Sequence, residues 1–100
     1  MVDIKKLTEK ILEFRNEHAW QKTNNSKDLA LALTTEAVEL NKLFLWQKPE
    51  IVLERRLKEE LADVFIYALL LLDNNDLDLE DIIKEKLTRD DKKYHLHNEL

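Results

Sequence analysis

The sequence predicts an all-α protein, because it lacks the residues that shape tight turns and its apolar residues recur at helical spacing. Among 100 residues there is no glycine and a single proline, Pro49. Glycine and proline supply most turns between strands, so their near absence favours helices joined by short connections. Ile4, Leu7, Ile11 and Phe14 recur every three or four residues, which is the period of one helix face.

Four helical segments follow from this periodicity and from residues that typically begin helices. Ser26 is a candidate N-cap for the second segment, and Pro49 fits the first helical position of the third. Asp78, followed by Asp81, resembles a capping arrangement for the fourth. We expect helices over residues 2–19, 27–46, 49–72 and from Asp78 to about Tyr94, with a frayed tail over 96–100.

The length of the chain predicts a single small domain over residues 1–100. Its short connections favour antiparallel neighbours in a compact, four-helix bundle-like arrangement. The later segments carry more apolar residues than one layer of partners within the chain would cover. We therefore expect a homodimer or a homotetramer, with such residues at its helical faces, among them Phe65, Ile66, Leu69, Leu70 and Leu72.

The composition argues against several classes of protein. The net charge is −5 and no basic stripe with interleaved aromatic residues stands out, so a nucleic-acid polymer is a poor candidate partner. The absence of cysteine excludes a disulfide framework and thiol chemistry. Residues 1–6 carry no apolar signal segment, and the longest apolar run is far too short to cross a membrane. We expect a soluble cytoplasmic protein.

Four acidic residues interrupt the apolar faces of the second and third segments. Glu36 and Glu39 are three residues apart on one, and Glu60 and Asp63 have the same spacing on the other. Because a helix advances about 100° per residue, each pair shares its face with apolar neighbours. Burying an unpaired carboxylate costs several kcal/mol, so these acids must be protonated, paired or metal-bound. An all-oxygen set of this kind suits Mg²⁺, with Mn²⁺ as the alternative.

The order of motifs along the chain resembles the MazG-like all-α nucleoside triphosphate pyrophosphohydrolases, in particular their short single-domain members and the dCTP pyrophosphatases. The resemblance covers residues 14–94, about four-fifths of the chain. The matching elements are Phe14-Arg15-x-Glu17-x-x-Trp20, Lys27-Asp28-Leu29-Ala30-Leu31, Glu36-Ala37-x-Glu39-Leu40 running to Phe44-x-Trp46, Glu59-Glu60-Leu61-Ala62-Asp63-Val64-x-Ile66-Tyr67, and finally Lys86 and Lys93-Tyr94.

The resemblance implies a MazG fold and an Mg²⁺-dependent enzyme in a house-cleaning role. Such an enzyme hydrolyses nucleoside triphosphates, often deoxy or non-standard ones, to the monophosphate and pyrophosphate. Position by position, it implies that Glu36, Glu39, Glu60 and Asp63 hold the metal. Glu36 or Glu39 is then the candidate to accept the proton of the attacking water. The chemistry agrees, because divalent ions held by carboxylates can neutralise a triphosphate and orient a water molecule.

The resemblance also implies a set of substrate contacts. Trp20, Trp46 and Tyr67 match positions that line the base and sugar pocket of dCTP-type members. Tyr67 lies one turn beyond Asp63 on the same face, close enough to crowd a sugar next to the metal. We therefore expect a preference for deoxyribose. The remaining candidates, of which the lysines match basic positions near the phosphates, are Lys27, Lys86, Asp90, Lys93 and Tyr94. From residue type alone, the tryptophans also fit core packing and the lysines also fit a solvated surface.

The chain departs from the family pattern near the expected base pocket and near its C-terminal end. Thr23 and Asn24 stand where the family often has Phe and His, Asp90 replaces an Asn, and His95 replaces a Pro. These departures leave the preferred base open. They also support an alternative, in which a catalytically weak helical module binds nucleotides or another protein.

Overall fold

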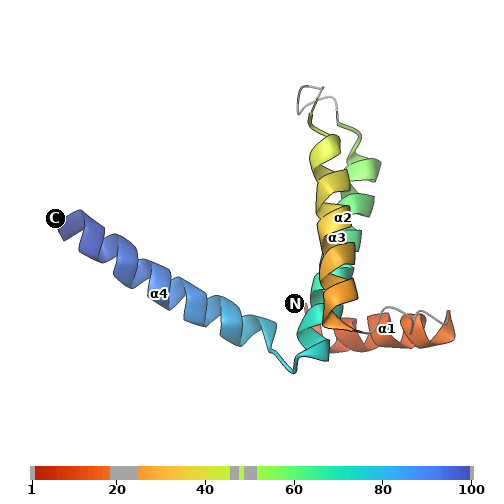
Figure 1. Ribbon diagram of the computed structural model, residues 1–100, viewed down its shortest axis with the longest axis horizontal. Helices are drawn as coiled ribbons and strands as arrows, with labels where there is room; N and C mark the ends of the chain where they lie inside the picture. The colour runs from red at the N-terminus through yellow and green to blue at the C-terminus, as the bar shows by residue number, and fades with distance from the viewer. Residues whose placement is uncertain (1, 19–24, 46–47, 49–51, 100) are drawn as a thin grey trace.

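The computed structural model describes residues 2–18, 25–45, 48 and 52–99, with side chains up to Lys93. These residues form four helices and no strand, which confirms the all-α class (Figure 1). The helices are α1 (Ile4–Glu17), α2 (Ser26–Lys42), α3 (Glu54–Asn74) and α4 (Leu79–Glu99). None of the helices in these ranges is long and apolar enough to cross a bilayer.

Helices α2 and α3 form an antiparallel hairpin that contains the buried core (Figure 1). Among the described residues, the buried apolar side chains are Leu29 and Leu43 from the α2 side and Leu69 and Leu70 from α3. At the open end of the hairpin, where α2 begins and α3 ends, Asn74 and Asn75 each donate a side-chain hydrogen bond of 2.9 Å to Ser26 Oγ. The hairpin is therefore held by apolar packing along its length and by polar contacts at one end.

Asn25, and not the predicted Ser26, is the N-cap of α2. Its Oδ1 accepts a 2.8 Å hydrogen bond from the Asp28 backbone N–H, which satisfies one unpaired donor of the first turn. The predicted cap at Asp78 is confirmed, because Asp78 Oδ2 accepts a 3.0 Å bond from the Asp81 N–H. Pro49 lies outside the described residues.

Three helix ends differ from the predicted ones by four residues or more. Helix α2 ends at Lys42 instead of near Trp46. The described residues that follow it, 43–45, form a turn. Helix α3 begins at Glu54. Helix α4 continues to Glu99, beyond the expected end at Tyr94.

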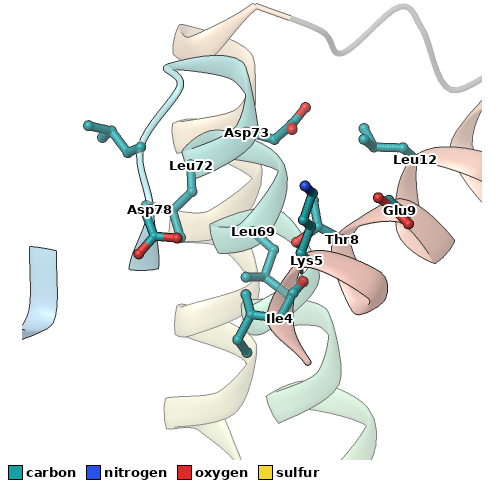
Figure 2. A pocket seen from close by; sticks show the side chains of 10 residues that line it. Ile4, Lys5, Thr8, Glu9, Leu12, Leu69, Leu72, Asp73 and Asp78 are labelled. Carbon is teal, nitrogen blue, oxygen red and sulfur yellow. Dashed lines mark hydrogen bonds between the residues drawn. The ribbon is translucent and has the colours of Figure 1, made fainter. Parts of the chain in front are cut away.

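Helix α1 crosses the hairpin near the end of α3. A hollow of about 240 Å³ lies between them. It is lined by Ile4, Thr8 and Leu12 of α1 on one side and by Leu69 and Leu72 of α3 on the other (Figure 2). Because these α1 residues are four residues apart, they lie on one side of the helix. This packing covers only one flank of the hairpin.

The turn after α3 is a Schellman motif with an aspartate in its left-handed position. The Leu77 N–H donates to the Leu72 carbonyl at 3.0 Å, the Asp76 N–H donates to the Asp73 carbonyl at 3.2 Å, and Asp76 has φ of 54°. Glycine usually fills this position, and the chain has none. Asp tolerates the left-handed region better than most residues.

Helix α4 leaves this turn and extends away from the hairpin instead of packing along it (Figure 1). The radius of gyration is 16.8 Å, whereas a compact domain of this length has about 13 Å. The expectation of a compact bundle within one chain is therefore wrong, although the four helices are present. Because α4 does not pack along the hairpin, the apolar residues on one side of α2, α3 and α4 have no cover from this chain.

Candidate metal and active site

Three of the four predicted acids meet in the middle of the hairpin. Glu36 of α2 and Glu60 and Asp63 of α3 each place one carboxylate oxygen within 4.8 Å of the others. Glu60 and Asp63 share a face because they are three residues apart, and the antiparallel pairing brings Glu36 opposite them. All three are partly buried. We call these three residues the acid cluster.

The acid cluster is electrostatically unfavourable without a cation. Burial raises the pKa of Glu36 above its usual range, and the charges of Asp63 and Glu60, a hydrogen bond shared with Glu60 and the charge of Glu39 raise it further. Glu60 Oε2 is buried and accepts no hydrogen bond from a donor among the described residues. A buried carboxylate oxygen without a donor is costly, so the structure leaves a position that a cation or a proton would satisfy.

The donor set fits a hard divalent ion. The acid cluster offers only carboxylate oxygens, and the described residues place no histidine within it. Carboxylate oxygens suit Mg²⁺ and Mn²⁺, whereas zinc and copper sites usually include nitrogen or sulfur ligands. Glu36, Glu60 and Asp63 are therefore the residues that would hold such an ion.

Glu39 lies one helical turn beyond Glu36 and stands outside the acid cluster. Its Oε1 pairs with Lys42 Nζ at 3.3 Å, and its charge makes the smallest contribution to the raised pKa of Glu36. The role of Glu39 as a fourth ligand remains a prediction. Sequence reasoning overlooked Lys42, although a lysine three residues after a glutamate on a helix is within reach of it.

Tyr67 lies beside the acid cluster. Burial raises the pKa of its phenol, and the charges of Glu36 and Asp63 raise it further, because a phenolate next to two carboxylates would be repelled. The hydroxyl therefore stays protonated and able to donate a hydrogen bond. Its predicted place one turn from Asp63 agrees with this geometry.

The candidate phosphate contacts are spread over the chain. Lys27 is exposed in the first turn of α2, nine residues before Glu36 and so about 13 Å from it along the helix. Lys86 and Asp90 form an ion pair of 2.6 Å with each other, and Lys93 is exposed; all three belong to α4, which extends away from the hairpin (Figure 1). One chain alone does not bring the α4 residues to the acid cluster.

Three other predicted contacts are not characterised by the structure. Trp20 and Trp46 lie outside the described residues, and only the backbone of Tyr94 is described. Arg15, which lies in the motif of the first helix, has a buried Nε without a hydrogen-bond partner among the described residues. Burial of part of an arginine was not foreseen, because arginine is mostly exposed.

The fold and the acid cluster define the class: an all-α protein with a carboxylate centre between two antiparallel helices. Within that class, the chain belongs to the MazG-like family, which matches residues 31–100. It is 31% identical over 93 residues to dCTP pyrophosphatase 1 of Mus musculus and 32% identical over 93 residues to that of Bos taurus. Each match covers 85% of this chain and 55% of the relative, so the chain spans about half the length of these curated relatives.

A solved structure shares the whole architecture. The pyrophosphatase from Archaeoglobus fulgidus superimposes with a TM-score of 0.83 and 32% sequence identity, and the match covers 94% of both chains. The extended α4 is therefore compatible with the arrangement of helices in a solved relative of similar length. The agreement confirms the family and the fold that the motifs predicted.

Proposed function

We propose that this protein hydrolyses nucleoside triphosphates to the monophosphate and pyrophosphate, using Mg²⁺ or Mn²⁺. The observation that carries the proposal is the acid cluster, formed by Glu36, Glu60 and Asp63 at the centre of a MazG-like hairpin. The names of the dCTP pyrophosphatases and of the Archaeoglobus pyrophosphatase support this class of reaction. A house-cleaning role in the cytoplasm follows from the same resemblance.

The residues of the chain have distinct roles in this proposal. A divalent ion held by the acid cluster would neutralise the triphosphate and make water a better nucleophile. Glu36 or Glu39 accepts the proton of the attacking water, and Glu39 would supply a fourth oxygen to the ion. Tyr67 packs against the sugar next to the acid cluster, where a 2′-hydroxyl would be crowded, so we expect deoxynucleotides to be preferred.

In this proposal, the contacts to the phosphates and the base come from more than one chain. The proposed phosphate contacts Lys86 and Lys93, with Asp90 and Tyr94, lie on α4, and Lys27 lies at the far end of α2. Trp20 and Trp46 are proposed to stack on the base. Large apolar side chains such as Leu87 (61% exposed) and Phe65 (59% exposed) are uncovered, which supports a homodimer or homotetramer.

The test is pyrophosphate release from a panel of ribo- and deoxynucleoside triphosphates, with Mg²⁺ and with chelator. We expect chelator-sensitive release that is faster with deoxynucleotides. Glu60→Gln should lower kcat/KM by at least about 100-fold, because it removes a ligand of the ion. The matched control is Glu54→Gln on the same helix, an exposed side chain that pairs only with Lys58 in the described structure and should leave release unchanged.

Two results would contradict the proposal. Undiminished release by a folded Glu60→Gln variant would show that the acid cluster does not hold the ion. Absence of release from the whole panel by the folded wild-type protein would favour a binding module, which would still shift its melting temperature when a nucleotide is added.

A further inference from the structure

The carboxylate of Glu39 lies between two groups that compete for it. Lys42 Nζ is 3.3 Å from Glu39 Oε1, and the two residues are three apart at the end of α2. Toward the start of α2, Glu36 of the acid cluster is also three residues away, and the charge of Glu39 acts on its carboxyl. The side chains of Lys42 and Glu39 are 59% and 43% exposed, so their ion pair can open without any change in the buried core.

A hollow beside this ion pair gives both side chains room to turn. It has a volume of about 200 Å³ and lies at the closed end of the hairpin, where α2 ends and α3 begins. Its lining residues are Glu39, Lys42, Leu43, Val52, Leu53 and Arg56. Arg56 precedes Glu60 by four residues on α3, so the hollow lies about one helical turn from the acid cluster. Glu39 therefore stands between a hollow with two basic side chains and a centre of three acids.

We propose that Lys42 is a positioning residue, which holds Glu39 away from the acid cluster until a divalent ion is bound there. Glu39 then leaves Lys42 and supplies a fourth carboxylate, and the ammonium group of Lys42 turns to solvent. This inference rests on the proposed function, because it assigns Glu39 to the ion of the acid cluster. It follows that the cost of opening the pair weakens ion binding, so Lys42 sets the affinity of a site that it does not touch.

The electrostatics of the metal-free protein explain why such a residue is useful. The three carboxylates of the acid cluster already repel one another, and a fourth carboxylate among them would add to the repulsion. Lys42 gives the charge of Glu39 a favourable partner one turn away. The fourth acid thus stays ionised and close by, and it joins the other three only when positive charge is present to accept it.

The affinity for Mg²⁺ alone, measured by calorimetry on protein that has been treated with chelator and dialysed, tests the role of Lys42 without any assay of activity. Lys42→Gln should bind Mg²⁺ up to about five-fold more tightly than the wild-type protein, because an exposed ion pair of this strength no longer has to open. Lys42→Arg keeps a cation beside Glu39 and should bind Mg²⁺ as the wild-type protein does.

A double-mutant cycle separates the ion pair from the general effect of removing a positive charge near the site. Through the ion pair, the gain in affinity from Lys42→Gln should disappear in a Glu39→Gln background. The matched control is Arg56→Gln, which removes the same charge from the same hollow. The described residues provide Arg56 with no ion pair, so its substitution should change the affinity by the same factor in both backgrounds.

The proposal is overturned if the gain from Lys42→Gln is equally large in the Glu39→Gln background, since the lysine would then act only through its charge. It is also overturned if Glu39→Gln binds Mg²⁺ as tightly as the wild-type protein, because Glu39 would then not be a ligand. Either result leaves Glu36, Glu60 and Asp63 as the proposed metal site. Failure of the proposed function would look different, since the wild-type protein itself would then bind no Mg²⁺.

Discussion

Glu36 is an acid whose charge the fold disfavours. It is the single acid of α2 that faces two acids of α3, and burial and these neighbours raise its pKa in the same direction. A carboxyl with a raised pKa in the folded state stabilises the fold only while it keeps its proton. The stabilisation by protonated Glu36 is fully present below the ordinary pKa of a glutamate. It is lost as the pH rises through the raised pKa of the folded state. At neutral pH the metal-free protein therefore carries unrelieved repulsion.

Glu36→Gln should make the metal-free protein more stable at pH 8 and leave its stability unchanged near pH 4. The glutamine cannot ionise, so it matches the protonated glutamate at low pH and avoids the repulsion at high pH. Because the site is partly exposed to solvent, we expect the free energy of unfolding at pH 8 to rise by no more than about 1 kcal/mol, which is a few degrees in Tm. Thermal unfolding in chelator, at both pH values, measures this.

The control for this variant is Glu13→Gln on α1, an exposed glutamate far from the acid cluster in sequence. It should change Tm by little at either pH. A lower stability of Glu36→Gln at pH 8 would mean that the Glu36 carboxylate is held by a favourable partner instead of being repelled.

At the scale of single elements, the turn between α3 and α4 determines the shape of the chain. Asp76 takes a left-handed conformation that costs an L-residue roughly 1–2 kcal/mol. The hydrogen bonds of the Schellman motif offset this cost. The direction of α4 thus depends on one backbone conformation that the residue type does not favour.

Asp76→Gly should stabilise the protein by about 0.5–1 kcal/mol, because glycine adopts positive φ without a steric penalty. Urea denaturation followed by circular dichroism measures the change. The matched control is Asp73→Gly in the last turn of α3, where φ is helical and glycine should cost up to about 1 kcal/mol. Equal destabilisation by both substitutions would show that Asp76 does not occupy the left-handed position in solution.

Local patterns predicted the helices, the cap at Asp78 and the meeting of three acids. Spacing fixes which residues share a face, and an antiparallel hairpin then brings Glu36 opposite Glu60 and Asp63. The pattern predicted Ser26 as the cap of α2, but Asn25 takes that position, since both residue types suit it. The pattern also could not show that Glu39 pairs with Lys42. A glutamate can bind a metal ion or pair with a lysine through the same carboxylate, and the sequence does not distinguish the two.

The direction of α4 could not be predicted either. The direction depends on the φ of Asp76 and on which surface covers the apolar side of α4, and neither is a local property of the sequence. Short connections predict neighbouring helices within a chain only when the chain covers its own apolar faces.

At the scale of the whole molecule, the acid cluster couples metal binding to stability. Three carboxylates that repel one another in the metal-free protein become ligands when an ion is present, so the ion binds the folded state and has no comparable site in the unfolded chain. Binding then stabilises the fold by RT ln(1 + [L]/Kd), or about 2.7 kcal/mol at a hundredfold excess of ion over Kd. The effect reaches the whole hairpin, because its two helices each supply ligands.

Addition of Mg²⁺ or Mn²⁺ to chelator-treated protein should therefore raise Tm in a saturable manner, by several degrees or more. Glu60→Gln should abolish most of this rise, whereas Glu54→Gln should retain it, since Glu54 is exposed at the start of α3. Addition of Na⁺ at equal ionic strength separates specific binding from general screening of the acids. If Na⁺ raises Tm as much as Mg²⁺ does, the acid cluster is a screened surface and not a metal centre. If Glu60→Gln keeps the full response, the ion binds elsewhere on the molecule.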